Sequence, residues 1–213
     1  KIEKKACRYE REKLQAEKHL DNFLINEMPP DCWNISLNEI EGLQDKNYFD
    51  CVTKCKNACK EARGLFLHGT MGTGKTYLAC CAANYMARND RKVCFINYPE
   101  FTRRMASLVR TGEHQKYIER LCYCDFLVID EIGGEAVTAW NRDQILFTVL
   151  AKRYDSHLTT WFTSNEDLNS LKQHFAISGN GREEDLKAER IIERIAKLAE
   201  PVRVLGEDRR KLQ

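Results

Sequence analysis

The sequence predicts an α/β fold of three layers, αβα, in which helices cover both faces of a mostly parallel sheet. From about residue 43 onward, short apolar runs of strand length alternate with helical patterns. A glycine-rich turn at 69–76 separates one apolar run from the helical pattern that follows it. Another apolar run, 126–129, ends in two adjacent acids. In a parallel sheet such features meet at the carboxyl edge of the strands, which is where ligands of these folds bind.

The composition indicates one folded core. The chain has 213 residues, 43% of them hydrophobic and 31% charged, which excludes a disordered chain. A formal net charge of +2 gives the whole molecule no strong attraction to nucleic acid or to an anionic membrane, so such contacts would need a local patch. No apolar run approaches the roughly 20 residues that span a bilayer, and a cytoplasmic protein is expected.

The N-terminal part is predicted to be a charged helical linker. Residues 1–27 are rich in Lys, Glu and Arg, and the helix should end at 28–30, because proline lacks the amide donor and disfavours helix in the residue before it. Residues 32–40 would then be a connecting segment. The expected organisation is a linker over 1–42 and a nucleotide-binding domain over 43–213.

Within the domain, apolar runs and helical periodicity locate the elements in order. The sequence predicts strands at 65–68, 93–97, 126–129 and 159–163, and helices at 45–62, 75–89, 99–108, 142–154 and 184–200, the last ended by Pro201.

The ten cysteines favour reduced thiols over disulfides. There is no CxxC pair, and several cysteines lie inside apolar runs. Cys51, Cys55 and Cys59 share one helix face, which could hold a metal ion. No His joins them, so a packed face is favoured and no zinc is expected in the core.

The segment 69–76 has the form GxxxxGK[ST] between a strand and a helix, which is the P-loop of nucleotide-binding proteins. Its glycines allow backbone amides to turn toward phosphate oxygens, and the helix N-terminus adds its positive end. Lys75 should reach the β- and γ-phosphates, and Thr76 should ligate Mg²⁺. ATP and Mg²⁺ are therefore the expected cofactors. The nucleotide-binding candidates are Gly69, Thr70, Met71, Gly72, Thr73, Gly74, Lys75, Thr76 and Tyr77.

The acids after the run 126–129 have the form of a Walker B motif. Asp130 should hold the Mg²⁺ shell, and Glu131 should act as general base toward a water molecule. Acids after a strand can also simply begin a solvated loop; the P-loop at a suitable spacing favours the catalytic interpretation. Asn165, after the next strand, could orient the water or contact the γ-phosphate, the role named sensor 1. It could instead cap the following helix.

Two arginines near the C-terminus share a helix face. Arg190 and Arg194 are spaced i, i+4, and either could reach the γ-phosphate of a neighbouring subunit as an arginine finger. Taken alone, the residues favour pairing with Glu189 or Glu193. Arg210 in the pair Arg209-Arg210 is either a sensor 2 residue or part of a basic tail.

Four segments resemble the AAA+ bacterial helicase loaders of the DnaI and DnaC type, and the DnaI type most. They are HGTMGTGKTYL (68–78), VIDEIGGEAVTAWNRDQIL (128–146), WFTSNEDLNSL (161–171) and KAERIIERIAKLAEPVRVLGEDRR (187–210). The resemblance covers nearly the whole chain and implies a RecA-like P-loop ATPase of the primosome. Such a protein would bind the hexameric DnaB-type replicative helicase and help to place it on single-stranded DNA during replication initiation or restart.

The resemblance also implies residue roles. The second arginine of its ERI-type motif is the finger, which maps to Arg194 and implies self-association and hydrolysis that depends on assembly; the closing motif maps sensor 2 to Arg210. The role of Arg190 stays open. These loaders carry an N-terminal helicase-binding domain, with zinc in the DnaI type, and this domain is expected to be missing from the sequence given; Cys7 could be its last ligand. Relatives often have Asp where this chain has Glu131, and either acid can serve as base.

DNA contact is expected in the family from helices after the second strand. Here that stretch carries five Arg or Lys residues against three Glu, with aromatic residues that could stack on bases. The stretch could equally be an ordinary solvated helix face. The candidate contacts are Phe101, Arg103, Arg104, Arg110 and Lys116.

Other functions share parts of this pattern. A transposition-helper AAA+ ATPase has the same core, and a small-molecule P-loop kinase would share the phosphate cradle without needing Arg194. A nucleotide switch would bind ATP with little hydrolysis. The acids at 130–131 and Asn165 suit water activation better than transfer to a bound acceptor.

Overall fold

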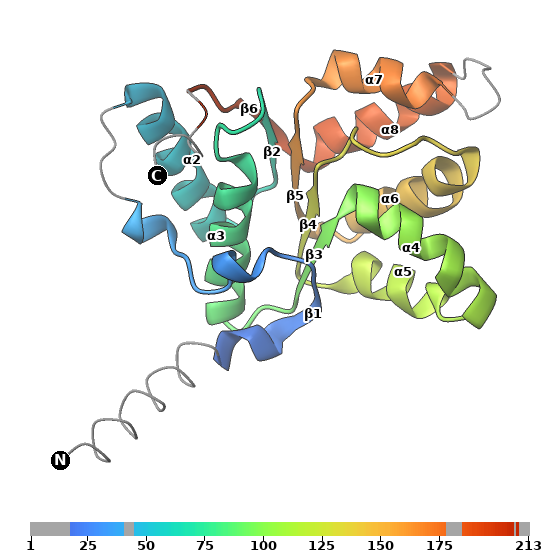
Figure 1. Cartoon of the computed structure of the whole chain (residues 1–213), viewed down its shortest axis with the longest axis horizontal. Helices are drawn as coiled ribbons and strands as arrows, with labels where there is room; N and C mark the ends of the chain where they lie inside the picture. Colours follow the sequence, from blue (N-terminus) through green and yellow to red (C-terminus); the bar gives the residue numbers. More distant parts are fainter. Residues whose placement is uncertain (1–17, 41–44, 178–184, 207, 209–213) are drawn as a thin grey trace.

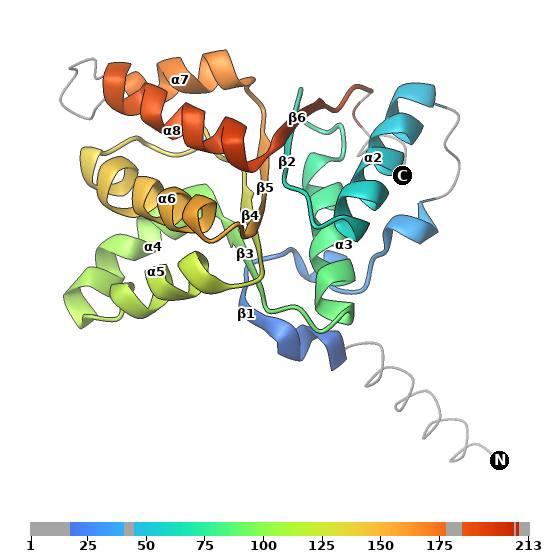
Figure 2. The same ribbon diagram turned by 180° about the vertical axis from the view of Figure 1, so that it is seen from behind.

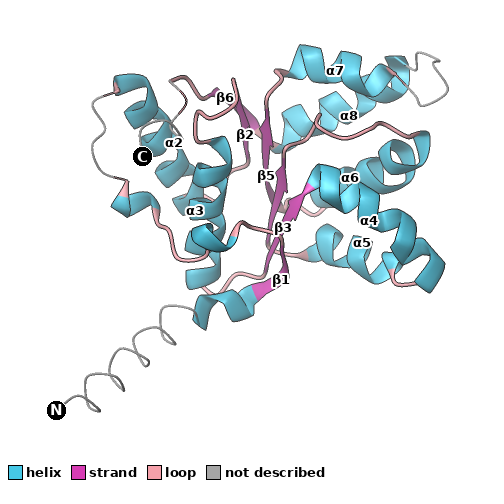
Figure 3. Cartoon of the chain, in the orientation of Figure 1, coloured by secondary structure: helices cyan, strands magenta, loops and turns pink. Residues whose placement is uncertain are grey.

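A six-stranded, fully parallel sheet forms the centre of the molecule in the computed structural model, which describes residues 18–40, 45–177, 185–206 and 208. Its strand order is β1-β3-β4-β5-β2-β6 (Figure 3). The strands are β1 (Phe23–Asn26), β2 (Leu65–His68), β3 (Val93–Asn97), β4 (Phe126–Asp130), β5 (Thr159–Ser164) and β6 (Glu200–Arg203).

Helices cover both faces of the sheet, which confirms the predicted three-layer α/β fold. Helices α2 and α3 lie on one face and α4 to α8 on the other (Figures 1 and 2). The α-helices are α2 (Lys46–Lys60), α3 (Lys75–Arg88), α4 (Tyr98–Thr111), α5 (His114–Tyr123), α6 (Phe147–Asp155), α7 (Leu168–Ala176) and α8 (Asp185–Leu198). A π-helix, η4 (Asn141–Leu146), leads into α6, and the 3-10 helices are η1 (Lys18–Asn22), η2 (Pro30–Cys32) and η3 (Leu37–Glu39).

Two apolar cores follow from the alternation of side chains along the strands. Phe66 and Ile129 belong to the core under α4 to α8, whereas Leu67 and Val128 belong to the core under α2 and α3. The cysteine face of α2 is buried in this second core. None of the helices in the described part of the chain is long and apolar enough to cross a bilayer.

The predicted helix over 1–27 is wrong where the structure describes it. Residues 18–22 form a 3-10 helix, and residues 23–26 form the edge strand β1 beside β3; residues 1–17 lie outside the described residues. The boundary at 42 separates segments that share one core, since Met28 and Leu37 are buried with the residues of α2 and α3.

The four predicted strands and the predicted domain helices are present with small shifts at their ends. The sequence missed α5, α7 and β6. Strand β6 includes Pro201, which pairs in register with Phe66. Because β6 is an edge strand, the missing proline amide leaves no buried partner unsatisfied. Helix α8 ends earlier than predicted, at Leu198, because Glu200 already begins β6.

Candidate nucleotide site

The P-loop lies between β2 and α3 and has the backbone that its glycines predict. Gly69 has φ +146° and Gly72 has φ +80°, both in the region that favours glycine. A Cβ atom at Gly69 would lie 2.4 Å from the Val204 carbonyl oxygen, and one at Gly72 would lie 2.1 Å from a carboxylate oxygen of Asp208. The loop is thus packed against the segment after β6, and larger residues at these two positions would displace it.

Lys75 begins α3, and its ammonium group lies against the loop. Its side chain is buried, and Nζ donates hydrogen bonds to the carbonyl oxygens of Gly69 (2.8 Å) and Thr70 (2.7 Å). The hydroxyl of Thr73 donates to the Thr70 carbonyl at 3.0 Å. These bonds hold the Lys75 ammonium inside the loop, where it would attract the phosphates of a bound nucleotide.

Asp130 ends β4 in contact with the P-loop helix. The hydroxyls of Thr76 and Thr163 donate to the same carboxylate oxygen of Asp130, at 2.9 and 2.6 Å. Burial raises the pKa of Asp130 to about 6, and the two hydroxyl bonds oppose that rise. A hydroxyl beside a carboxylate is an oxygen donor set of the kind that Mg²⁺ takes up, so the residues fit this ion.

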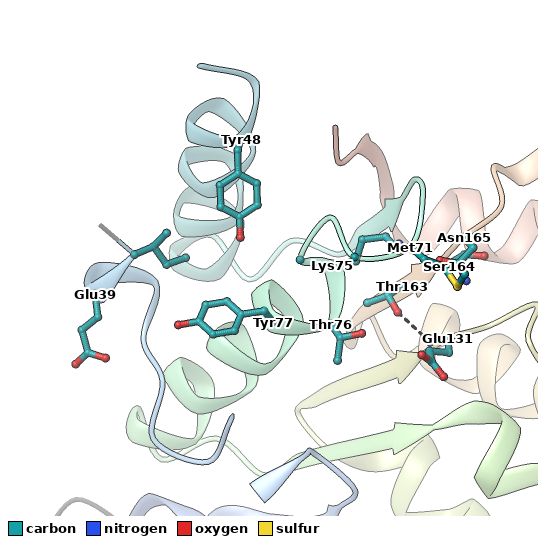
Figure 4. A pocket seen from close by; sticks show the side chains of 13 residues that line it. Glu39, Tyr48, Met71, Lys75, Thr76, Tyr77, Glu131, Thr163, Ser164 and Asn165 are labelled. Carbon is teal, nitrogen blue, oxygen red and sulfur yellow. Dashed lines mark hydrogen bonds between the residues drawn. The ribbon is translucent and has the colours of Figure 1, made fainter. Parts of the chain in front are cut away.

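Glu131 turns away from the line of the strand. Its φ of 59° is unusual for a residue other than glycine and directs the side chain to the cavity described below (Figure 4). Its backbone amide donates to the Thr163 hydroxyl at 2.9 Å, and the Asn97 amide group donates to Oε2 of Glu131 at 3.1 Å. Asn97 was not predicted to belong to the site. It ends β3 beside Asp130, and a polar residue at the end of a neighbouring strand could have indicated it.

A cavity of about 550 Å³ joins part of the P-loop to Glu131. Asn165 lies at its edge beside Ser164, whose hydroxyl donates to the Ile132 carbonyl at 2.6 Å. Gly69, Thr70, Thr73 and Asp130 are not among the lining residues. The lining residues are Glu39, Ile40, Tyr48, Met71, Gly72, Gly74, Lys75, Thr76, Tyr77, Glu131, Thr163, Ser164 and Asn165 (Figure 4).

The N-terminal segment supplies part of this cavity. Glu39 and Ile40 line it, together with Tyr48 of α2 and Tyr77 of α3 (Figure 4). Because residues 1–42 were predicted to be a linker, Glu39 and Ile40 were not predicted to be site residues. The side chains of Glu39, Tyr48 and Tyr77 lie at the opposite end of the cavity from those of Glu131 and Asn165 (Figure 4).

The two arginines of α8 stack on aromatic rings. Arg194 lies 4.9 Å from the centre of the Tyr154 ring, and Arg190 lies 4.4 Å from that of Phe147. The alternative partners are engaged elsewhere, since Glu193 pairs with Lys197 and Glu189 with Lys172. The end of α8 leads into β6 at the amino edge of the sheet, opposite the P-loop, and Arg194 does not line the cavity. Arg209 and Arg210 lie outside the described residues.

Among the DNA-contact candidates, Phe101 is wrong. Its side chain is buried in the core under α4, 6.3 Å from the ring of Tyr98, and cannot stack on a base. Arg103 pairs with Glu100 at 3.1 Å, and Arg104 pairs with Glu27. The side chains of Arg110 and Lys116, also among the candidates, form no ion pair within the described ranges.

Comparisons with known proteins agree with this geometry. A sequence model of the family described as IstB-like ATP binding protein matches residues 42–213. The replicative helicase loader DnaI of Bacillus subtilis is 36% identical over 157 residues, 74% of this chain and 50% of the relative. The replicative helicase loader DnaC of Buchnera aphidicola is 26% identical over 119 residues, 54% of this chain and 48% of the relative. The chain thus spans about half the length of these curated relatives.

Solved structures show the same fold. A crystal structure of DnaI superposes with a TM-score of 0.76 at 28% identity, covering 90% of this chain and 99% of that one. A crystal structure of the DnaC helicase loader, at 18% identity, has a TM-score of 0.69 and covers 83% of this chain and 100% of that one.

Proposed function

The chain belongs to the family of IstB-like ATP-binding proteins, and from this premise we propose that it is the ATP-hydrolysing module of a replicative helicase loader. The observation that carries the proposal is the single cavity that joins the P-loop to Glu131 and Asn165. A site that only held a nucleotide would need no carboxylate and amide at the γ-phosphate end. The carboxylate can take a proton from water, and the amide can orient it.

In the proposed reaction each residue has a separate task. Lys75 and the loop amides bind the phosphates, and Thr76 and Asp130 hold Mg²⁺. When bound, this ion neutralises charge on the phosphate oxygens. Glu131 takes a proton from the attacking water. The hydrogen bond from Asn97 keeps the Glu131 carboxylate at the cavity and restricts its orientation.

Hydrolysis is proposed to need a second copy of the chain. Arg194 lies toward the opposite edge of the sheet from its own P-loop, so it cannot complete its own site without a large rearrangement. Its guanidinium is already held over Tyr154, which reduces the entropy cost of presenting it to a neighbour. Self-association would therefore form the active site.

The proposed partners are a DnaB-type helicase and single-stranded DNA, and this part rests on what the related loaders are named for. The test uses the full-length protein that contains this chain, with Glu131→Gln to keep ATP bound and Lys75→Ala as the nucleotide-free control. Each is mixed with the replicative helicase or with a transposase of the same organism.

Capture of the helicase that is stronger for Glu131→Gln than for Lys75→Ala supports a loader. Capture of the transposase alone would overturn it in favour of a transposition helper.

A further inference from the structure

A segment that precedes α2 packs against the P-loop helix α3, and we call its residues 28–40 the strap. Met28 and Leu37 anchor the strap, because both are buried in the core under α2 and α3. Its last two residues, Glu39 and Ile40, line the nucleotide cavity (Figure 4). A nucleotide that fills this cavity would therefore contact the strap as well as the P-loop.

Asn84 of α3 fixes the middle of the strap. Its side chain is buried, and Nδ2 donates hydrogen bonds to the carbonyl oxygens of Cys32 (2.8 Å) and Ile35 (3.1 Å). Cys80 lies four residues before Asn84, so the two side chains share one face of α3. The backbone of Cys32 is thus held against the face of the helix that carries Cys80.

The side chains of Cys32 and Cys80 are also in contact, since their two thiols form a hydrogen bond. Both thiols are free. Cys80 is fully buried one turn after Thr76 of the P-loop, whereas Cys32 is half-buried. The contact therefore joins a thiol that solvent reaches to a thiol inside the helix that carries the nucleotide site.

We propose that Cys32 and Cys80 are a modification site: a peroxide oxidises them to a reversible disulfide, which fastens the strap to α3 and slows the release of nucleotide. This inference goes beyond the proposed function. It needs a nucleotide in the cavity, but neither a helicase nor DNA.

Cys32 has the properties of the thiol that reacts first. The hydrogen bond from Cys80 lowers the pKa of Cys32, and the same bond, together with burial, raises the pKa of Cys80. The accessible sulphur is then the one that ionises, while its neighbour keeps its proton. An accessible thiolate beside a second thiol is the arrangement found in redox-sensitive cysteine pairs.

The other thiol contacts in the described part of the chain lack this access. Cys51 and Cys55 form a hydrogen bond within α2, and Cys94 forms one with Cys124. All four are buried, whereas Cys32 is the one described cysteine that is not. Buried thiols react slowly with solvent oxidants, which favours oxidation at Cys32.

The proposed reaction has two steps. The Cys32 thiolate attacks one oxygen of hydrogen peroxide, the O–O bond breaks, and hydroxide leaves as a sulfenic acid forms on Cys32. Cys80 then attacks the Cys32 sulphur, the S–O bond breaks, and water leaves with the Cys80 proton. The two sulphurs together lose two electrons, and the peroxide is reduced to two water molecules once the hydroxide takes up the proton that Cys32 released.

The test exposes the reduced full-length protein that contains this chain to a small excess of hydrogen peroxide. Remaining thiols are blocked with N-ethylmaleimide, and mass spectrometry of a digest made without reductant identifies the linked peptides. Stopped-flow fluorescence then measures the release of mant-ADP before oxidation, after it, and after treatment with dithiothreitol.

The variants are Cys32→Ser and Cys80→Ala, and thermal melting checks that each is folded. The matched control is Cys51→Ser, because Cys51 also contacts a second thiol but is buried. Cys32 is half-buried, so Cys32→Ser decides the outcome even if Cys80→Ala does not fold.

We expect a peptide that joins Cys32 to Cys80 and release that is slower by about 10-fold or more after oxidation, because the disulfide restricts opening of the strap. Dithiothreitol should restore the original rate. Cys32→Ser should form no such peptide and should release mant-ADP at the reduced rate with or without peroxide. Cys80→Ala should stop at a sulfenic acid on Cys32 that dimedone traps, and Cys51→Ser should respond as the wild type does.

Three results would overturn the proposal. In the first, peroxide leaves Cys32 free to react with N-ethylmaleimide or links it to a cysteine other than Cys80. In the second, Cys32→Ser still shows slower release after oxidation, or Cys51→Ser loses the effect. In the third, the disulfide forms in full and the release of mant-ADP is unchanged, so that the strap does not control the nucleotide.

Discussion

Replacing Asp130 by Asn should make the nucleotide-free protein more stable, by an amount that grows with pH. The buried carboxyl has a pKa of about 6, against 3.8 for an ordinary Asp. The folded state therefore holds this proton to higher pH than the unfolded state does. It follows that the contribution of Asp130 to the free energy of unfolding of the wild type falls as pH rises from about 4 to about 6. A shift of about two pKa units corresponds to about 3 kcal/mol.

Asp130→Asn lacks this ionisation and can still accept the hydroxyl bonds of Thr76 and Thr163. Its stability relative to the wild type should be near zero at about pH 4 and should reach up to about 3 kcal/mol at about pH 7. Urea unfolding over this pH range measures the difference. The control is Asp155→Asn, which removes an exposed carboxylate at the end of α6 and should have little effect at any pH.

A difference between Asp130→Asn and the wild type that stays constant with pH, or that shrinks as pH rises, would refute the reasoning. It would mean that burial does not set the protonation of Asp130. The stabilised variant should at the same time lose Mg²⁺-dependent ATP binding, because the carboxylate is the proposed ligand.

Three further predictions concern the same sheet edge. Lys75→Ala should abolish ATP binding in calorimetry, because its ammonium is the buried cation of the loop; retained affinity would contradict its role. Glu131→Gln should bind ATP as the wild type does while turnover falls by about 100-fold or more, as expected for loss of a general base; unchanged turnover would remove Glu131 from the chemistry. His174→Gln should lower stability most at low pH. Glu135 raises the pKa of His174 above 6.5, so the pair stabilises the fold below pH 6.5 and this contribution is lost as pH rises through the raised value. A stability difference that grows with pH would contradict it.

The central site was predictable because it is local in the chain. A strand, a glycine turn and a helix are contiguous at 65–88, and the residues of this segment themselves determine the backbone conformation of the loop. The contact between Asp130 and Thr76 could also be predicted, since both residues lie at the carboxyl edge of a parallel sheet.

Contacts between distant segments were less predictable. Asn97 and Glu39 reach the site only through the strand order and the packing of the N-terminal segment. The burial of Phe101, by contrast, could have been predicted from the spacing of the apolar residues in α4. Tyr98, Phe101 and Met105 follow helical spacing and form the buried face of α4, which leaves Arg103 outward.

The most direct test of the account is complementation between two inactive variants of the full-length protein. Lys75→Ala keeps Arg194 but cannot bind ATP, and Arg194→Ala keeps the P-loop but lacks the finger. Each alone should show little turnover, and an equal mixture should recover about a quarter of wild-type turnover at a concentration where the wild type assembles, because one contact in four pairs an intact P-loop with an intact finger. A mixture no more active than its two components, beside a wild type whose specific turnover does not depend on protein concentration, would contradict a shared ATPase site.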